Sequence, residues 1–429
     1  MHSTAVVMNM FYTGLGIARS LGEKGIPVIG LSAQRGIYGN FTRYAKCLAC
    51  PDSRSEPEEL LSFLLKLGKD IGSRSVLFPT RDHDLVFLDR FRRELEPSYS
   101  LVVPDRGPLS SCLDKWQTYL AAQQSGVPTP KCWLVGNRQE LLETAGEVSY
   151  PCILKPVAAH YWRRDGNWNL VGGRKVVFIE SQDQLLAEYP VVARADERVL
   201  LQEMIPGGDE CLVIAACYLD RNSNLVAGFN AQKLAQAPSL VGTGCIVQAA
   251  DYPELFDPAV RLLKELQFTG LAEVEFKWDA AKKVYQLIEI NPRPWDQHRL
   301  GVGCGADLML LAYHEHAGLP MPPVHPRPSA QKWVAEDTLA MSVLEMLWVR
   351  DPAWRSLFRL ARGKRIYAIW SLTDPLPAIA YLVTQFIPGV IGRLMRVLRA
   401  RLKKNRSAQL VFRKGVRYES TLDDGKSRS

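Results

Sequence analysis

The sequence has few features of a disulfide-rich or zinc-binding protein. It contains nine cysteines among 429 residues, and only Cys47 and Cys50 form a close Cys-x-x-Cys pair. A zinc site of this type needs a second pair or nearby histidines. The first residues, MHSTAVVMNMFYTGLG, lack a basic segment and a small-residue cleavage site, so we expect no signal peptide. A cytoplasmic protein with reduced thiols is therefore the expectation.

Acidic residues are missing from one long stretch near the C-terminus. Residues 375–418 contain ten Lys or Arg and no Asp or Glu, whereas the rest of the chain carries 43 basic and 45 acidic side chains. The net charge of +8 therefore belongs to this stretch and not to the body of the chain. No recognised nucleic-acid module or aromatic platform accompanies the charge, so we expect no nucleic-acid partner.

Two interpretations of this basic stretch remain open. Residues 375–392 carry no charged side chain, but proline and glycine interrupt them, which makes a membrane span marginal. Residues 391–404 place apolar side chains on one helical face and basic side chains opposite. Residues 375–418 are therefore expected either to contact anionic membrane peripherally, at the inner face of the cell membrane, or to pack on the body of the chain or a partner.

The N-terminal residues follow an α/β pattern. Residues 5–31 read as strand, turn, helix and strand, and residues 75–91 continue with a buried strand, a turn and a helix. Two glycines after the first strand suggest a dinucleotide fingerprint, but Arg19 stands where its third glycine is expected. The second strand ends in Ser32 without an acidic residue for a ribose. The pattern therefore favours a structural glycine turn over NAD binding.

The loop at residues 160–175 is unusually polar and contains aromatic residues and glycines. A loop of this length inside a compact domain is more often a functional lid than a simple connection. Its segment Gly172-Gly173-Arg174-Lys175 would suit phosphates, which backbone N–H groups and cations bind. An ordinary solvated loop is the alternative.

The most informative stretch is residues 271–298, which read as two strands joined by a short polar loop. The first strand, residues 271–278, alternates apolar and charged side chains, and the second, residues 284–290, is β-branched and apolar. Side chains two apart on a strand share a face, so Glu289 and Asn291 point the same way.

The face that carries these two side chains is expected to be rich in oxygen ligands. If Trp278 pairs with Val284 across the loop, Glu273 and Glu275 lie on that face too. Carboxylates beside an amide oxygen are the hard ligands that Mg²⁺ prefers. Arg293 follows between two prolines, and its planar guanidinium suits a phosphate or a carboxylate. The hairpin therefore predicts a metal and nucleotide site in preference to an ordinary surface hairpin.

The ordered set of motifs resembles the ATP-grasp superfamily over about residues 1–320. It is most similar to the carboxylate–amine ligase branch, which includes D-aspartate ligases, and more distantly to biotin carboxylase and carbamoyl-phosphate synthase. The motifs that carry the resemblance are Asp114-Lys115, Gly126 to Pro130, Ile153 to Pro156, the glycine-bearing loop, Gln202 to Glu210, Glu275-Phe276 and Glu289 to Arg293.

This resemblance implies a chain of α/β and α+β class. A pre-ATP-grasp α/β domain at residues 1–113 precedes a two-subdomain ATP-grasp domain at residues 114–320, which clamps ATP between sheets. A C-terminal subdomain at residues 321–374 comes after a proline-rich link. A basic apolar tail at residues 375–429 forms a C-terminal helical extension.

The resemblance also implies roles for individual residues. The nucleotide-binding set would be Lys115, Lys155, Gly172, Gly173, Lys175, Glu203, Met204, Ile205, Glu210 and Lys233. Within this set, Glu203 to Ile205 would hold adenine, Glu210 would reach the ribose, and Lys233 would contact the triphosphate. Mg²⁺, with Mn²⁺ as the alternative, would be held by Glu275, Glu289 and Asn291. Arg293 would meet an acyl phosphate and, together with Lys233, would be catalytic.

The reaction implied is that of an ATP-dependent ligase. A small carboxylate would be activated by ATP as an acyl phosphate and joined to an amine acceptor, with release of ADP and phosphate. Bicarbonate activation and a non-catalytic ATP-binding module at the membrane are the alternatives. Related ligases usually show Lys-Leu-Arg near Lys233, whereas Ala235 replaces the arginine here. The two substrates and the oligomeric state stay open.

Overall fold

The computed structural model describes residues 2–164, 166–348, 350–390 and 392. The chain divides into one unit of residues 1–377 and a second that begins at Ala378. The last described elements are α16 (Leu376–Tyr381) and the π-helical turn η4 (Leu382–Phe386). Nearly all of the amphipathic helix expected at residues 391–404 lies outside the described residues. None of the described helices has the length and apolar character needed to cross a bilayer.

The N-terminal domain is built on a five-stranded parallel sheet with the order β3-β2-β1-β4-β5. Buried apolar side chains fill its strands, as expected for a parallel sheet covered on both faces. The strands are β1 (Ala5–Met8), β2 (Val28–Ser32), β3 (Lys46–Ala49), β4 (Ser75–Phe78) and β5 (Tyr99–Leu101). The helices are α1 (Tyr12–Gly22), η1 (Tyr38–Phe41), α2 (Pro57–Ile71), α3 (Asp82–Arg90), α4 (Arg92–Leu95) and α5 (Arg106–Leu113). The strand, helix and strand predicted within residues 5–31 are confirmed.

The strand order of this sheet marks a place for a ligand. β1 has β2 on one side and β4 on the other, so the chain leaves β1 and β4 in different directions. In open parallel sheets, ligands bind at the carboxyl ends of the strands on either side of such a reversal. Thr13 follows β1, and residues 80–83 follow β4. These residues lie at the edge of the cleft described below.

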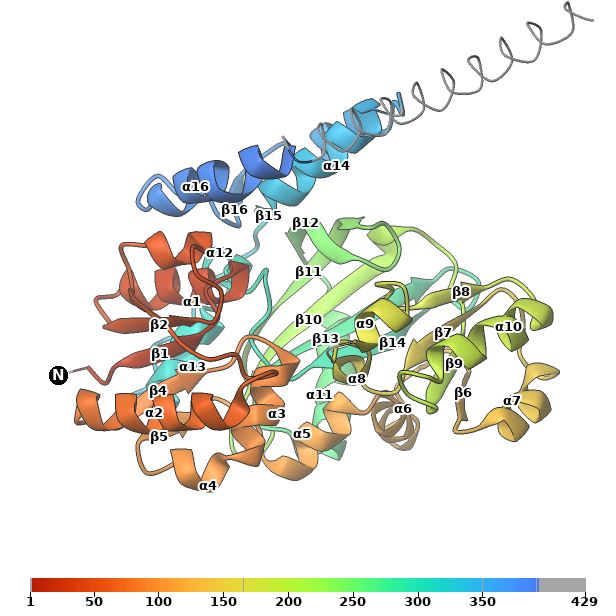
Figure 1. Cartoon of the computed structure of the whole chain (residues 1–429), viewed down its shortest axis with the longest axis horizontal. Helices are drawn as coiled ribbons and strands as arrows, with labels where there is room; N and C mark the ends of the chain where they lie inside the picture. The colour runs from red at the N-terminus through yellow and green to blue at the C-terminus, as the bar shows by residue number, and fades with distance from the viewer. Residues whose placement is uncertain (1, 165, 349, 391, 393–429) are drawn as a thin grey trace, which may run out of the picture. The chain divides into compact units, whose positions relative to one another are not determined.

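A second, smaller sheet is antiparallel and has the order β6-β9-β7-β8. Its strands are β6 (Cys132–Val135), β7 (Cys152–Pro156), β8 (Val177–Ile179) and β9 (Val199–Glu203). Figure 1 shows α7 (Arg138–Ala145) and α10 (Gln182–Val192) beside this sheet. Residues 160–175, predicted as a loop, contain most of the short helix α8 (Ala159–Trp162) and all of the short helix α9 (Asn167–Leu170). The prediction of a loop therefore missed these two helical turns.

The largest sheet has seven strands in the order β14-β13-β10-β11-β12-β15-β16. The strands are β10 (Leu212–Leu219), β11 (Leu225–Ala237), β12 (Thr243–Ala250), β13 (Gly270–Asp279), β14 (Val284–Asn291), β15 (Lys332–Val334) and β16 (Arg365–Tyr367). Their neighbours in the chain are η2 (Asp209–Cys211), η3 (Pro253–Leu255), α11 (Phe256–Glu265), α12 (Leu300–Gly303) and α13 (Leu308–His316). Buried side chains of α11 and of β10, β13 and β14 form one core cluster, which fixes one face of the sheet.

The helix α6 (Lys115–Gln124) shows why the chain turns at the motif Asp114-Lys115. The Asp114 carboxylate accepts hydrogen bonds from the backbone N–H groups of Trp116 and Gln117 at 2.9 and 3.0 Å. This N-cap satisfies two donors that the first helical turn leaves without partners. The helix ends at Gln124, two residues before Gly126, where φ is +67°. Lys115 is thereby fixed at the first helical position.

Residues 321–374 extend the largest sheet. β15 pairs antiparallel with β12, and β16 pairs parallel with β15. β15 ends at Val334, and the helix α14 (Glu336–Trp348) begins two residues later. Another helix, α15 (Trp354–Leu360), precedes β16. The boundary at residue 321 stays a prediction.

A buried ion pair fastens the end of this segment to α1. Arg19 and Asp374 are each 1% exposed, and the Arg19 Nε donates to the Asp374 carboxylate at 3.0 Å. The same carboxylate accepts from the Thr42 hydroxyl at 2.7 Å and from the backbone N–H of Arg43 at 3.0 Å. Arg19 also donates to the carbonyl of Ile369 at 2.6 Å. The two charges therefore have several polar partners each, as a buried pair requires.

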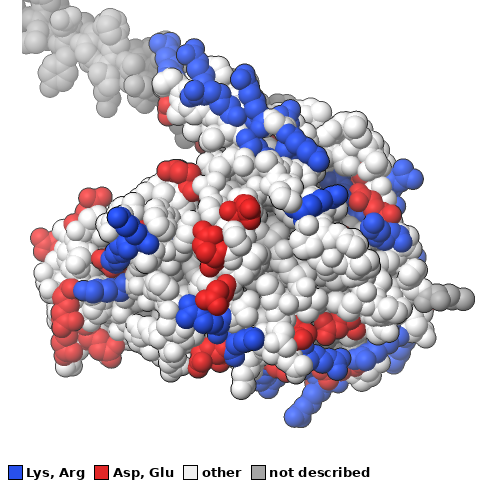
Figure 2. Space-filling model, turned by 180° about the vertical axis from the view of Figure 1, so that it is seen from behind, with Lys and Arg blue, Asp and Glu red and all other residues white. Residues whose placement is uncertain are grey.

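The surface of the body is electrically mixed. On the face in Figure 2, acidic and basic side chains are interspersed, apart from a group of basic side chains near the top. This distribution agrees with the near balance of charge outside residues 375–418.

Candidate nucleotide and metal site

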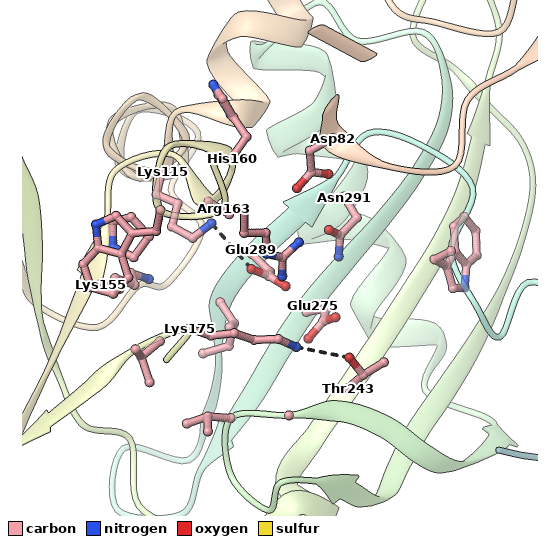
Figure 3. Close-up of a pocket in the computed structure, with 18 of the residues that line it drawn as sticks. Asp82, Lys115, Lys155, His160, Arg163, Lys175, Thr243, Glu275, Glu289 and Asn291 are labelled. Atoms are coloured by element: carbon pink, nitrogen blue, oxygen red, sulfur yellow. Dashed lines mark hydrogen bonds and ion pairs between the residues drawn. The ribbon is translucent and has the colours of Figure 1, made fainter. Parts of the chain in front are cut away.

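A cleft of about 890 Å³ is lined by side chains from all three sheets and their loops. Thr13 and Asp82 come from the N-terminal domain, and Lys155 comes from β7 of the small sheet. Lys233 of β11 and Glu275 of β13 come from the large sheet. In Figure 3, Lys115, Lys155 and Lys175 lie on one side of the carboxylates of Glu275 and Glu289, and Asp82 lies on the other. Parts of the chain far apart in sequence thus meet here.

The predicted pairing of the hairpin was wrong by one residue. A β-bulge nevertheless places the acidic side chains of the two strands on the same face. Trp278 pairs with Tyr285 instead of Val284. The register then shifts between Glu275 and Phe276, so that Glu275 lies opposite Glu289. The strand beyond the bulge is therefore displaced by one residue relative to its partner.

The bulge lets one strand serve both the core and the cleft. Leu287 and Ile290 are both buried in the core cluster although they are three positions apart, an odd spacing that regular alternation would place on opposite faces. The extra residue, Ile288, lines the cleft together with Glu289 and Asn291. The predicted convergence of Glu273, Glu275, Glu289 and Asn291 on one face is consequently present.

Each of the acidic side chains on this face has a specific partner. The Lys233 Nζ donates to Glu275 Oε2 at 2.6 Å, and both side chains are almost fully buried. The Asn291 Nδ2 donates to Glu273 Oε2 at 2.9 Å. Glu273 is 3% exposed, and its Oε1 has no hydrogen-bond partner. The Asn291 Oδ1 accepts a long hydrogen bond of 3.5 Å from the Arg293 Nη2.

The carboxylates titrate very differently because their cationic neighbours differ. Burial and the nearby Glu275 raise the pKa of Glu273 to about 8. Burial also raises the pKa of Glu289, but Lys115 and Lys233 outweigh it, and the pKa is lowered to about 2. Glu289 is therefore ionised at neutral pH, as a metal ligand must be. Burial lowers the pKa of Lys233, yet Glu275 and Glu273 raise it above its ordinary value.

Arg293 is held by the N-terminal domain. Its Nε donates to Asp82 Oδ1 at 2.6 Å, and its Nη1 donates to the carbonyl of Pro294 at 3.2 Å. Burial alone would raise the pKa of Asp82, but Arg293 and Arg163 hold it well below its usual range. The guanidinium is thus oriented by a carboxylate that lies 211 positions away in the sequence.

Lysines line the opposite side of the cleft. Lys115 lies 3.7 Å from Glu289. The Lys155 Nζ donates to the hydroxyl of Tyr119 at 3.1 Å, and burial lowers the Lys155 pKa to about 8. The Lys175 Nζ donates to Thr243 Oγ1 at 3.1 Å. This dashed contact in Figure 3 joins residues 160–175 to β12 of the large sheet.

The structure brings most of the predicted site residues to one place. Those that line the cleft are Lys115, Lys155, Lys175, Met204, Ile205, Lys233, Glu275, Glu289, Asn291 and Arg293. Four others lie outside its lining: Gly172, Gly173, Glu203 and Glu210. The roles given to all of them stay predictions.

The four residues outside the lining have other surroundings. Gly172 and Gly173 have φ of +65° and +68°, a backbone conformation that favours glycine. The Glu203 carboxylate binds the Lys282 Nζ at 3.1 Å. Glu210 lies in the short helix η2, where its carbonyl accepts from Gln232 at 2.7 Å.

Sequence reasoning missed several polar residues of the cleft, among them Asp82, Arg163 and Asp296. Asp82 and Asp296 each follow a strand end, which was the available signal. Asp296 accepts a hydrogen bond from the Thr13 hydroxyl at 2.6 Å, so this contact also joins the large sheet to α1. Their proximity depends on how domains dock, which no local pattern contains.

The donor set of the hairpin fits a hard divalent cation. Glu275, Glu289 and Asn291 supply two carboxylates and one amide from paired strands, on the same side of the sheet. Within the described ranges, no group of three or more His, Cys, Asp or Glu side chains is placed to bind a metal by itself. Mg²⁺ commonly takes only one or two carboxylates and completes its shell with water and substrate phosphates. The residues therefore suit Mg²⁺ bound jointly with a nucleotide.

The part of the chain that supplies most of the cleft resembles a known domain family. Residues 112–295 match the family model described as the ATP-grasp domain. The predicted fold class is confirmed.

Two curated relatives show the range of reactions among similar sequences. The formate-dependent phosphoribosylglycinamide formyltransferase of Sulfurisphaera tokodaii is 26% identical over 54% of this chain and 58% of its own length. The D-aspartate ligase of Enterococcus faecium is 22% identical over 59% of this chain and 62% of its own length. The chain thus spans about three fifths of these relatives.

Solved structures support the fold. The biotin carboxylase of Campylobacter jejuni, solved with β-γ-ATP, superposes with a TM-score of 0.61 at 17% identity over 75% of this chain and 72% of that chain. The N5-carboxyaminoimidazole synthetase of Staphylococcus aureus, complexed with ADP, gives a TM-score of 0.59 at 15% identity over 82% of this chain and 87% of that chain. At such identities the likeness concerns the fold alone.

Proposed function

We propose that the protein is a Mg²⁺- and ATP-dependent ligase that joins a carboxylate to an amine. The observation that carries the proposal is the convergence of two carboxylates and an amide on one face of the cleft, opposite several lysines. A triphosphate needs cations along its length, and its bound metal needs hard oxygen ligands. The curated relatives named as ligases support this class of reaction.

The chemistry follows in two steps. A carboxylate oxygen of the first substrate attacks the γ-phosphorus of ATP, the bond to the β–γ bridging oxygen breaks, and ADP leaves from an acyl phosphate. The amine nitrogen of the second substrate then attacks the acyl carbon, loses a proton, and displaces phosphate to form an amide. The protein contributes mainly position and charge in both steps.

The basic residues of the cleft have different roles in these two steps. Lys115, Lys155 and Lys175 neutralise phosphate charge, and Lys233 approaches the triphosphate from β11. Arg293, oriented by Asp82, faces the acyl phosphate.

Glu275, Glu289 and Asn291 would hold Mg²⁺, or Mn²⁺ in its place. The metal would neutralise phosphate oxygens and hold them in line for transfer.

The test compares the double variant Glu289→Ala/Asn291→Ala with wild type. ADP release is measured with pooled amino acids and small acids, and Glu254→Ala removes an exposed carboxylate outside the cleft as the control. We expect turnover to fall by at least about a hundredfold in the double variant and to persist in the control.

Other outcomes would point to a different reaction. Full activity of the double variant would refute the metal assignment. Bicarbonate-stimulated ATP cleavage without an amine would favour bicarbonate activation, and tight nucleotide binding without turnover on any substrate would favour a non-catalytic module. A cytoplasmic location and the membrane contact at residues 375–418 stay predictions, which vesicle sedimentation of the full chain would test.

A further inference from the structure

The cleft contains more positive charge than its own acidic residues neutralise. Several of its basic side chains have acidic partners within 4 Å, among them Lys233 with Glu275, Arg293 with Asp82 and Lys115 with Glu289. Lys155 and Lys175 donate only to neutral oxygens. A further cation, Arg163, donates no side-chain hydrogen bond to any described residue. Unpaired cations in a partly enclosed cleft are costly unless an anion binds them.

Arg163 is placed in the cleft by its backbone. It follows α8 directly, and its carbonyl accepts a hydrogen bond from Arg54 of the N-terminal domain at 3.3 Å. Figure 3 shows the Arg163 side chain entering the cleft in the region of Glu289. Residue 163 is half-buried. The side chain thus reaches the site from the small sheet's loop, while Arg293 follows the end of β14 in the large sheet.

The charge of Arg163 lowers the pKa of two other side chains that line the cleft. After burial and Arg293, it is the next influence on the pKa of Asp82, which it lowers. After burial, it is the largest influence on the pKa of Lys175, which it also lowers. Arg163 therefore lies in the same cleft as Asp82 and Lys175 and close enough to influence both.

The other two arginines of residues 160–175 are engaged elsewhere. The guanidinium of Arg164 stacks over the ring of Tyr161, 4.5 Å from its centroid, and the residue is exposed. Arg174 pairs with Glu188 at 3.0 Å. All three arginines line the cleft, and Arg163 is the one whose guanidinium has neither an acidic partner nor an aromatic ring among the described residues.

We propose that Arg163 binds the terminal phosphate of ATP and holds that phosphoryl group opposite Arg293 as it moves to the carboxylate. A planar guanidinium matches two phosphate oxygens at once, which a lysine does not. The phosphate would balance the charge of Arg163, whereas Arg293 already has Asp82 as an acidic partner. This assignment rests on the proposed ligase function and adds to it the residue that distinguishes a triphosphate from a diphosphate.

The experiment measures the affinity of the full chain for Mg·AMP-PNP and for Mg·ADP by titration calorimetry. The variants are Arg163→Ala and Arg163→Lys, and Arg194→Ala removes an exposed arginine that follows α10, as the matched control. We expect Arg163→Ala to lower the AMP-PNP affinity by about tenfold or more and to change the ADP affinity by less than about twofold. Arg163→Lys should restore only part of the loss, and Arg194→Ala should leave both affinities unchanged.

Two results would overturn the assignment. Equal losses for both nucleotides would show that Arg163 supports the loop or the adenosine end, and unchanged affinities would show that it touches no phosphate. Retained ADP affinity in the same titrations shows that the variant is folded. If wild type bound neither nucleotide, the proposed function itself would fail. If wild type bound both nucleotides and Arg163→Ala bound them equally well, only the assignment of Arg163 would fail.

Discussion

The buried pair of Arg19 and Asp374 allows a quantitative prediction about stability. The variant Asp374→Ala removes the carboxylate that accepts from Arg19, Thr42 and the Arg43 backbone, and it leaves a guanidinium that is 1% exposed without its counterion. Breaking a buried pair in this way costs about 3–5 kcal/mol. Unfolding entropy of about 2.1 cal/mol/K per residue gives about 0.8 kcal/mol/K for a unit the size of residues 1–377. The melting temperature should therefore fall by about 4–6 °C.

The assay is a thermal melt of each variant at one scan rate. Glu58→Ala is the control, because it breaks the pair with Arg90 in which both side chains are more than half exposed. An exposed pair is worth less than about 1 kcal/mol, so its melting temperature should change by about 1 °C or less. The double variant Arg19→Met/Asp374→Ala should lose less than the sum of the two single variants, because the charges depend on each other. A loss in Asp374→Ala no larger than that in Glu58→Ala would refute the reasoning.

Two further predictions concern the cleft. In Asp82→Asn, Arg293 loses its anionic partner at 2.6 Å, so turnover measured by ADP release should fall by about tenfold while Mg·ADP affinity stays within about twofold; an equal loss of both would contradict an orienting role. Burial lowers the pKa of Lys155 to about 8, so the nucleotide-free protein loses this positive charge as the pH rises through that value. The affinity for Mg·ADP should accordingly fall between about pH 7 and pH 9. Lys155→Met should show weaker affinity without that pH dependence, and a flat wild-type profile would argue against Lys155 as a phosphate contact.

Local patterns predicted the parts of the site that lie on single elements. The alternation within residues 271–278 and 284–291 indicated that Glu275, Glu289 and Asn291 share a face, and the structure places them together. The Asp114 side chain caps α6 through backbone N–H groups two and three positions away, which is also a local feature. These features depend on residues that are close to one another in the sequence, so a local sequence pattern is enough to predict them.

Other parts of the site depend on long-range packing. The bulge at Ile288 moved the hairpin register by one residue, because both Leu287 and Ile290 are buried in the core beneath the sheet. The contact between Asp82 and Arg293 exists only once the N-terminal domain docks on the large sheet. No periodicity within one segment signals either feature.

The anchoring of Asp374 beside Arg19 has a consequence for shortened forms of this protein. The part that matches the ATP-grasp family ends at residue 295, yet the N-terminal helix α1 relies on a counterion that lies 79 positions beyond it. A fragment ending at residue 320 would leave the Arg19 guanidinium in a pocket with no anion, and we expect it to aggregate or be digested. The smallest autonomous fragment should therefore retain Asp374, although this residue lies well outside the recognised domain.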